Sequence, residues 1–229
     1  MCALVRNDGE GAWERPSLTP QLEENNLRIC VDNHVIVCYP VENAKEANGL
    51  QRELPGCTLR YDDTLPRGAE TLMAALFAGG PLMLSQVCHI SGLEPYVIQN
   101  WVARGFLPPP VGKKYARRQL CRILLIHTLR GVLSLERIVS LLSYVNGHLD
   151  DESDDTVDDF QLYLWLVRCL HAPAGEEEKA LPACLAEYEE PFPGAGRRLE
   201  QVLRILVTAA RAAALQEQAQ ALIDALDER

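Results

Sequence analysis

Residues 84–115 have the sequence LSQVCHISGLEPYVIQNWVARGFLPPPVGKKY, and this stretch decides the fold that we expect. Ser85 is predicted to cap a short helix, because its hydroxyl can accept from a first-turn N–H, and Gly92 is predicted to end that helix. Pro95 suits the first turn of a second helix, through Arg104, where no N–H is needed. Two short helices joined by a turn that contains glycine are typical of a helix-turn-helix motif.

The second helix has one apolar face, which sets the side chains that reach solvent. Ile98 and Trp101 lie three residues apart on that face. Trp101 is therefore expected in the core rather than as a stacking platform for bases. The polar residues Gln99, Asn100 and Arg104 then fall on the outer face.

Residues 105–115 cannot continue this helix, because three prolines remove N–H donors and fix φ while a glycine near each end permits sharp turns. We expect a short loop with Lys113, Lys114 and Tyr115 at its tip. Two further helices are predicted over residues 118–132 and 135–145.

At these positions the chain resembles a known family. The order VIQNWVARGFLPP, GKKYARRQL and LLIHTLRGVLSLERIVSLL resembles the DNA-binding region of MerR-type winged-helix regulators. The elements LSQVC, NWV and YVNG, followed by DDESDD, are similar to an uncharacterised bacterial family of MerR-like domains of unknown function. The resemblance covers residues 84–166. It implies a winged helix-turn-helix over residues 84–115, with Lys113 and Lys114 in the wing and two supporting helices after it.

The chain departs from the MerR pattern at two places. It has Gln99-Asn100-Trp101 on the second helix where MerR regulators usually carry Arg-Tyr-Tyr, so two amides replace a phosphate-binding arginine. A side-chain amide can pair bidentately with adenine N6 and N7 in the major groove. The C-terminal half shows no cysteine metal loop or recognised ligand pocket, so the resemblance carries over no small-molecule effector and leaves open whether this chain binds one.

The charges are distributed unevenly along the chain. The whole sequence has a formal net charge of -10, whereas residues 84–148 hold eight basic residues against two acidic ones. One basic segment in an acidic protein suggests a single surface for a polyanion, although a solvated helix face gives the same pattern. The position of the basic cluster beside the second helix favours phosphate contacts. The residues expected to bind double-stranded DNA are Gln99, Asn100, Arg104, Lys113, Lys114, Tyr115, Arg117 and Arg118. Tyr115 has the alternative role of anchoring the loop.

The sequence predicts four parts. Residues 1–66 are an N-terminal extension in which β-branched runs around Asp32-Asn33 predict a β-hairpin. Residues 67–171 are the winged-helix domain with its supporting helices. Residues 172–196 are rich in proline and glutamate and are expected to be an acidic linker. Residues 197–229 are predicted to form a long Ala-rich helix, whose apolar stripe is either a dimer seam or a face packed on its own chain.

Residues 150–159 hold seven acidic side chains. An EF-hand loop that began at Asp150 would need glycine at its sixth position and glutamate at its twelfth, which this chain lacks. We expect Ser153 or Asp154 to cap a helix through Leu170, and the acidic run to reach back to the basic helices.

The sequence lacks the motifs that identify several functional classes. The eight cysteines and five histidines show no metal-ligand spacing, so we expect reduced thiols and no metal or other cofactor. His89 and His127 lie on apolar faces and are expected in the core. The chain has no nucleophile elbow, P-loop or dinucleotide fingerprint, so no enzyme activity is predicted. Residues 1–25 lack an apolar signal region and no stretch suits a membrane helix, which favours a cytoplasmic protein.

The sequence thus predicts a mainly α fold with a winged helix-turn-helix, an N-terminal β-hairpin and a long C-terminal helix. The function that it favours is a bacterial-type transcriptional regulator that binds DNA as a homodimer, with base contacts from the second helix and phosphate contacts from the wing. The alternative is a helical protein-interaction module that keeps the winged-helix shape without binding DNA. The net charge of -10 supports this alternative.

Overall fold

The computed structural model describes residues 51–62, 67–146, 155–172 and 177–227, together with four short strands within residues 1–50. The chain separates into two compact units, residues 1–50 and residues 51–229. Each unit is held together by its own internal contacts.

Two antiparallel strand pairs make up the described part of residues 1–50. The pairs are β1 (Val5–Arg6) with β2 (Trp13–Glu14), and β3 (Leu27–Asp32) with β4 (Val35–Pro40). Asp32 of β3 lies opposite Val35 of β4, and Cys30 lies opposite Val37. This pairing confirms the hairpin that the β-branched runs predict. The turn that joins β3 to β4 lies outside the described residues.

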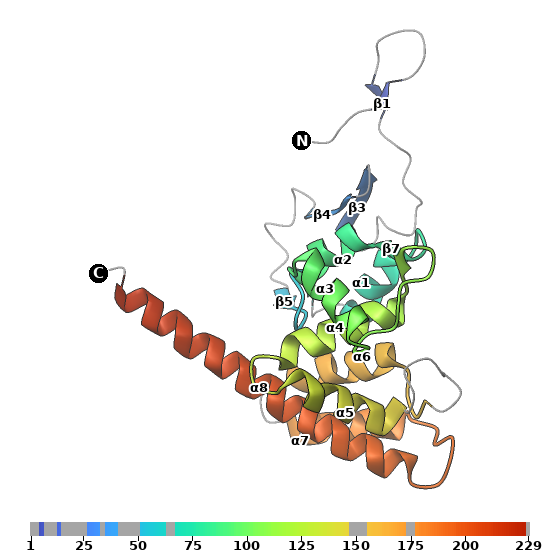
Figure 1. Cartoon of the computed structure of the whole chain (residues 1–229), viewed down its shortest axis with the longest axis vertical. Helices are drawn as coiled ribbons and strands as arrows, with labels where there is room; N and C mark the ends of the chain where they lie inside the picture. The colour runs from blue at the N-terminus through green and yellow to red at the C-terminus, as the bar shows by residue number, and fades with distance from the viewer. Residues whose placement is uncertain are drawn as a thin grey trace. The chain divides into compact units, whose positions relative to one another are not determined.

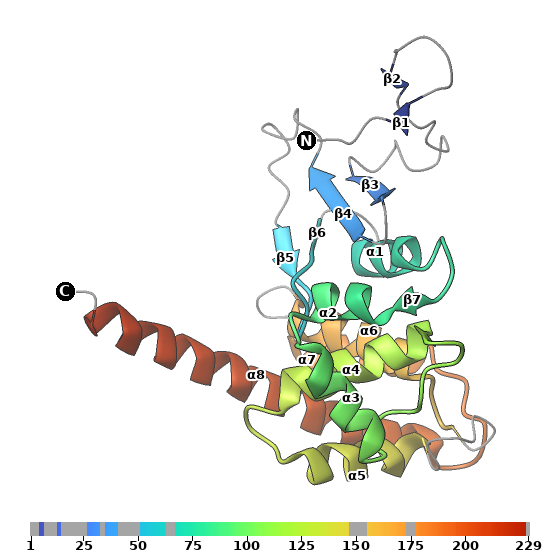
Figure 2. The ribbon, with the colours of Figure 1, turned by 45° about the horizontal axis from the view of Figure 1, so that its top comes forward.

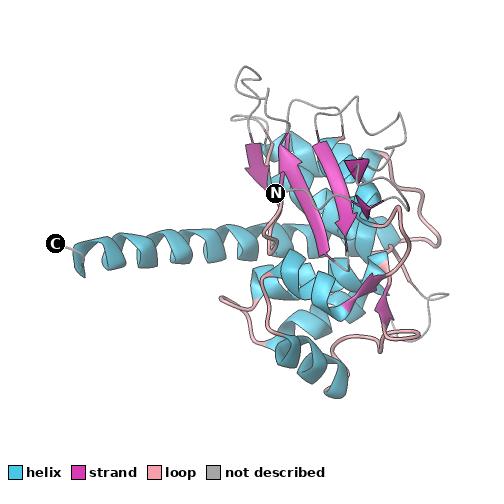
Figure 3. Cartoon of the chain, turned by 90° about the horizontal axis from the view of Figure 1, so that it is seen from above, coloured by secondary structure: helices cyan, strands magenta, loops and turns pink. Residues whose placement is uncertain are grey.

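The described part of residues 51–229 is mainly helical, as predicted, and helices make up most of the ribbon in Figure 3. The paired strands are β5 (Gln51–Glu53) with β6 (Arg60–Asp62) and β7 (Leu82–Met83) with β8 (Lys114–Tyr115). The helices are α1 (Gly68–Leu76), α2 (Leu84–Ser91), α3 (Pro95–Ala103), α4 (Arg117–Leu129), α5 (Leu135–Asn146), α6 (Asp159–Leu170), α7 (Glu177–Ala186) and α8 (Ala195–Asp227). Within the described residues, no helix combines the length and the apolar character needed to cross a membrane.

Local capping explains where α2 and α3 begin and end. The Gln86 side chain accepts from the Met83 N–H at 2.8 Å, so α2 begins after Met83. Ser85 lies inside the first turn, and the cap predicted there is wrong. Gly92 ends α2 in the left-handed conformation, with φ 68°, and Pro95 opens α3, both as predicted.

The start of α6 differs from the predicted one. Asp158 caps the helix, because its side chain accepts from the Phe160 N–H at 3.2 Å. The predicted caps Ser153 and Asp154 lie in residues 147–154, outside the described part of the chain, and α6 begins later than they require. An aspartate four or five residues further along provides the same acceptor, and the spacing of the acidic run does not distinguish these positions.

Residues 172–196, which the composition indicates to be a linker, contain the ten-residue helix α7. Leu181 and Cys184 of α7 are buried, and the helix contacts α6 and α8. Pro182 lies inside the helix. The apolar positions 181 and 184 are three residues apart, which is the helical signal within this acidic stretch.

The core of residues 51–229 is centred on α4 and α6. Residues 119–126 of α4 and residues 162–167 of α6 are all buried. Neither helix has an exposed face over those ranges, because the two helices pack against each other and other helices surround them. The helix α4 also contacts α2, α5 and α8, and the helix α6 also contacts α1, α7 and α8. The dense apolar sequence of residues 160–169 predicts this burial for α6, whereas the spacing in residues 118–132 predicts only one inward face for α4.

The two halves of α8 have different surroundings. Leu199, Val202 and Leu206 are at most 1% exposed, and this first half contacts α4, α5, α6 and α7. The second half extends beyond the other helices of residues 51–229, as Figures 1 and 2 show. Leu215 and Leu222 there are 66% and 65% exposed. Packing on its own chain is thus confirmed for the first half, whereas the dimer seam stays a prediction.

Candidate nucleic-acid interface

The helices α2 and α3 share one apolar core. Val87 and Ile90 of α2 and Ile98 and Trp101 of α3 are at most 2% exposed. Trp101 is therefore a core residue, as its spacing from Ile98 predicts. Because these residues hold the inner side of α3 against α2, the opposite side of α3 is left to solvent.

The solvent side of α3 is polar. Gln99 and Asn100 are exposed, as predicted. Tyr96 is 70% exposed one turn earlier, and sequence reasoning missed it. Its spacing of three and four residues from Gln99 and Asn100 is the signal that places the three side chains on one face. This face offers two amides and one phenol hydroxyl as hydrogen-bonding groups.

The basic loop, residues 105–116, contains a tight hairpin turn. The Lys114 N–H donates to the Val111 carbonyl at 3.0 Å. Gly112 and Lys113 between them have φ values of 57° and 63°, a pattern typical of a type I′ turn. Glycine adopts this conformation freely, but a lysine side chain makes it costly. Lys113 and Lys114 are both exposed, so the turn presents two positive charges to solvent.

Tyr115 anchors the base of the basic loop. It is 3% exposed and lies opposite Leu82 in the β7–β8 pair. Burial raises the pKa of its phenol. Of the two roles left open by the sequence, the geometry supports the loop anchor and leaves little of this side chain for DNA.

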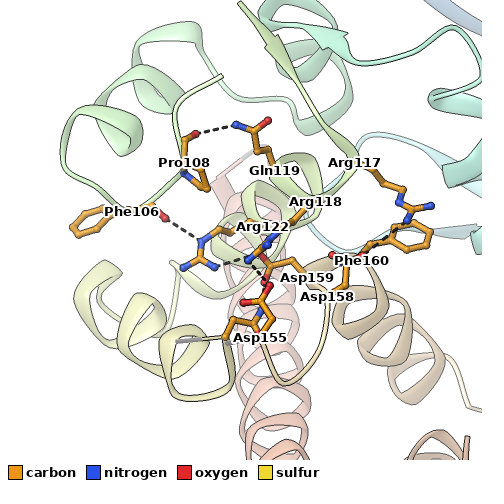
Figure 4. A network of polar contacts seen from close by, with 11 residues as sticks. Phe106, Pro108, Arg117, Arg118, Gln119, Arg122, Asp155, Asp158, Asp159 and Phe160 are labelled. Carbon is orange, nitrogen blue, oxygen red and sulfur yellow. Dashed lines mark hydrogen bonds and ion pairs between the residues drawn. The ribbon is translucent and has the colours of Figure 1, made fainter. Parts of the chain in front are cut away.

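Two side chains of α4 hold the start of the basic loop, as Figure 4 shows. Gln119 Nε2 donates to the carbonyl of Pro108 at 3.0 Å and to that of Pro109 at 2.9 Å. Arg122 Nε donates to the carbonyl of Phe106 at 3.2 Å. These side-chain donors satisfy three carbonyls of the loop and fix the loop to α4.

The same arginine connects the loop to a buried ion cluster on α6. Arg122 Nη1 lies 3.2 Å from Asp159 Oδ2, and Arg118 Nη2 lies 2.7 Å from Asp155 Oδ2. Asn146 Nδ2, at the end of α5, donates to Asp159 Oδ1 at 2.9 Å. The acidic run thus reaches back to the basic helices, as predicted, in the part of the run that the structure describes.

Burial dominates the electrostatics of this cluster. Desolvation raises the pKa of Asp159, and the guanidinium groups of Arg122 and Arg118 offset part of the rise. The Arg118 side chain is only 14% exposed. The structure therefore places Arg118 inside the molecule with α6, apart from the exposed Lys113 and Lys114 with which the sequence grouped it.

Arg104 and Arg117 are exposed but already engaged. Arg104 Nη2 donates to Glu136 Oε1 at 2.7 Å. The Arg117 guanidinium lies 3.9 Å from the Phe160 ring centroid, and its Nη2 is 3.9 Å from Asp158 Oδ2. Exposed ion pairs of this kind are weak, so both arginines can exchange these partners for phosphate.

The two histidines expected in the core differ. His127 Nδ1 lies 3.2 Å from the Gly56 carbonyl oxygen, and burial lowers the pKa of its imidazole. His89 is exposed, so its predicted burial is wrong. Val87 and Ile90 lie on the inner face of α2, and His89 lies outside that face.

Among the described residues, no three His, Cys, Asp or Glu side chains are grouped so that they could hold a metal ion.

One segment of the chain matches a known family. Residues 81–163 match the family described as Domain of unknown function (DUF1836). The matched segment begins just before β7 and ends within α6, so it contains α2, α3, the basic loop and the ion cluster. This match confirms the resemblance to a family of domains of unknown function.

A curated relative matches over a longer stretch. The chain is 28% identical over 151 residues to "Uncharacterized protein YkrK" of Bacillus subtilis (strain 168). The aligned part is 64% of this chain and 60% of the relative, so the chain spans less than two thirds of the relative's length. No solved structure matches the chain.

Proposed function

We propose that the chain is a DNA-binding transcriptional regulator and that residues 84–115 are a winged helix-turn-helix of MerR-like type. The observation that carries the proposal is the pairing of two features in one short segment. The second helix exposes the amides of Gln99 and Asn100, and the loop that follows presents Lys113 and Lys114 on a tight turn. Amides read base edges in the major groove, whereas lysines hold phosphates.

The exposed residues divide into those that would contact base edges, called readers here, and those that would contact phosphates. Gln99 and Asn100 are the readers, and the exposed Tyr96 is added to them because its hydroxyl lies on the same face. Lys113 and Lys114 are the primary phosphate contacts, and Arg104 and Arg117 join them when they leave their acidic partners. Arg118 and Tyr115 hold the domain together beneath this surface.

The regulator acts in the cytoplasm as a homodimer. One winged helix covers a short half-site, so useful specificity normally needs two copies related by a twofold axis. The exposed leucines of α8 offer a surface for a second copy. Nothing in the described residues points to a small-molecule effector, an enzymatic reaction or a cofactor.

A second candidate function is a protein-interaction module of the same shape. It is favoured by the acidic partners that Arg104, Arg117 and Arg118 have within the chain, which reduce the charge available to DNA. The formal net charge of -10 acts in the same direction. The two functions differ in one measurable property, the binding of duplex DNA with a strong dependence on salt.

The test is a gel-shift titration with pooled genomic fragments, followed by sequencing of the retained DNA. We expect a preferred site, and a slope of log K against log salt of about -4 to -5 if roughly five phosphates are neutralised. Lys113→Ala with Lys114→Ala should weaken binding to all DNA, and Asn100→Ala should cost roughly 1 to 3 kcal/mol on the preferred site alone. Lys179→Ala, at an exposed position of α7, is the control. Absence of binding at low salt contradicts the proposal and favours the interaction module.

A further inference from the structure

Two cysteine thiols meet where α7 packs on α6. Cys169 lies in the last turn of α6, and Cys184 lies in the last turn of α7. Both are free thiols, they are 2% and 0% exposed, and a hydrogen bond joins their side chains. Two sulfur atoms at hydrogen-bond distance need only a short movement to form a disulfide bond. The packing of α7 on α6 therefore brings together a pair of thiols that can be linked.

Charged side chains make the two thiols unequal. The hydrogen bond from Cys169 and the charge of Arg168, which also donates to the Cys184 sulfur, lower the pKa of Cys184, against the opposing effects of burial and Glu187. The same thiol–thiol hydrogen bond, together with burial, raises the pKa of Cys169. Cys184 is therefore the thiol that ionises first, and the thiolate is the nucleophilic form of cysteine.

Two other cysteines give the contrast. Cys121 of α4 is fully buried, and burial, together with the nearby Asp159, raises the pKa of its thiol well above the ordinary value. Cys88 of α2 is half-buried, and burial raises the pKa of its thiol as well. Both stay protonated near neutral pH, so the arrangement at the α6–α7 contact favours oxidation at Cys184 over these two sites.

We propose that Cys169 and Cys184 form an oxidisable dithiol, which hydrogen peroxide converts into a disulfide bond between α6 and α7. In the first step the Cys184 thiolate attacks one peroxide oxygen, the O–O bond breaks, and the hydroxide that leaves takes up a proton to become water. In the second step the Cys169 sulfur attacks the sulfur of the Cys184 sulfenic acid, the S–O bond breaks, and a second water leaves with the thiol proton. The two thiols lose two electrons and the peroxide gains them. This site is independent of the proposed DNA binding and of the proposed dimer.

The end of α7 provides a route for the oxidant to the buried thiols. Pro182 lies inside α7, two residues before Cys184. A proline inside a helix removes an N–H that would donate to the preceding turn, and helix ends open more readily than helix interiors. Opening of the last turn of α7 uncovers Cys184, whereas Cys169 stays on α6. Closing of the turn then brings the oxidised sulfur back to Cys169, and the disulfide bond fixes α7 to α6.

The test uses the full chain, reduced, freed of reductant and treated with hydrogen peroxide. The remaining thiols are alkylated under denaturing conditions, and the chain is digested with trypsin. Cleavage leaves Cys169 in peptide 169–179 and Cys184 in peptide 180–197, and neither peptide contains another cysteine. We expect mass spectrometry to find these two peptides joined, and a reductant to separate them. Two thiols that are still free, or a link to any other cysteine, overturn the proposal.

Serine variants separate the roles of the two thiols. In Cys169→Ser, we expect Cys184 to accumulate as a sulfenic acid that dimedone traps, because the second thiol is missing. Cys184→Ser should give no disulfide bond and no trapped product at Cys169. Cys88→Ser is the control and should form the disulfide bond as fast as the unchanged chain. Dimedone on Cys169 overturns the assignment of Cys184 as nucleophile. The peptide map of the unchanged chain decides the proposal even if a serine variant does not fold.

A rate measurement tests the part given to Arg168. We expect Arg168→Gln to slow the loss of the Cys184 thiol about threefold or more, because less of it is thiolate at neutral pH. Arg168→Lys keeps the positive charge and should restore most of the rate. Arg204→Gln, at an exposed position of α8, is the matched control and should leave the rate unchanged. Equal rates in the two glutamine variants overturn the role of Arg168 in activating the thiol.

Discussion

Asp159 joins three helices through one carboxylate. It lies in the first turn of α6, receives a hydrogen bond from Asn146 of α5 and forms an ion pair with Arg122 of α4. Arg122 in turn donates to the Phe106 carbonyl at the start of the basic loop. The position of the loop is therefore linked, through two side chains, to the helix that carries the acidic run.

We predict that Asp159→Asn destabilises the fold by roughly 3 to 5 kcal/mol, because it leaves the guanidinium of Arg122 buried without a counter-charge. Asp158→Asn is the matched control. Asp158 is 45% exposed, and asparagine caps a helix as well as aspartate does, so this change should cost less than about 1 kcal/mol. Urea unfolding of both variants checks the prediction, and equal losses would contradict it.

His127 makes stability depend on pH. Burial lowers the pKa of its imidazole in the folded chain, so the unfolded chain binds the proton more readily. This contribution to stability is fully present above the unfolded pKa, about 6.5, and is lost as the pH falls toward the lower folded value. We expect His127→Gln to flatten the fall in unfolding free energy between pH 7.5 and 5.5, measured by urea titration. His89→Gln, at an exposed position, should leave that fall in place.

Trp101 and Arg118 show what residue spacing predicts and what it does not. The burial of Trp101 follows from its distance to Ile98, because both lie on one helix face. The burial of Arg118 depends on Asp155, 37 residues later, which reaches it only through the packing of α6 on α4. Spacing within a helix therefore predicts which face is apolar, and a non-local ion pair decides whether a cation stays on the surface.

At the scale of the elements, the hairpin turn of the basic loop places a charged lysine in a backbone conformation that costs stability. Lys113 has a φ of 63°, which disfavours any residue with a Cβ atom, and the residue before it is glycine. A glycine at position 113 would relieve this conformation. The presence of lysine there is consistent with a role for its charge at the tip.

We predict that Lys113→Gly raises the unfolding free energy by up to about 1 kcal/mol and at the same time weakens DNA binding. The slope of log K against log salt should become less steep by about 1 for each copy bound, since one phosphate contact is lost. Lys113→Asn should give the same change of slope, because asparagine also tolerates this conformation. An unchanged slope in both variants would exclude Lys113 as a phosphate contact.

The elements themselves were largely predictable, and their ends less so. The order of α2, α3, α4 and α5 follows from apolar periodicity and from glycine and proline positions. The start of α2 differs from the predicted one because the Gln86 side chain accepts from the N–H of Met83, and the helix begins at Leu84, before the serine that was expected to cap it. The helix α7 was not predicted, because the stretch was assigned by its composition. The glutamates and prolines dominate that composition, and only two positions of the helix carry the apolar spacing.

At the scale of the whole chain, the two halves of α8 correspond to the two alternatives that the sequence left open: the first half packs on its own chain, and the second half is the proposed dimer surface. Ala209 and Ala213 are 7% exposed and face the same chain, so a glutamate at either position would disturb the core of its own chain. The exposed leucines begin at Leu215. The helix thus covers the core that carries the proposed DNA-binding surface and continues, without interruption, into the surface proposed for a second copy.

We predict that a chain ending at Ala213 is a folded monomer. Its core residues Leu199, Val202, Leu203 and Leu206 remain, so its unfolding midpoint should match that of the full chain. A chain ending at Leu185, before α8, should not fold, because the loss of these four side chains alone, at about 1.5 to 3 kcal/mol each, approaches the whole unfolding free energy of a domain. The folded monomer should bind the preferred DNA site on the order of 100-fold more weakly, since the second half-site no longer binds within the same complex. Sedimentation and gel-shift titration of the shortened chain check both statements. A shortened chain that remains a dimer would place the seam within residues 1–213 and leave the exposed leucines of α8 without a role in assembly.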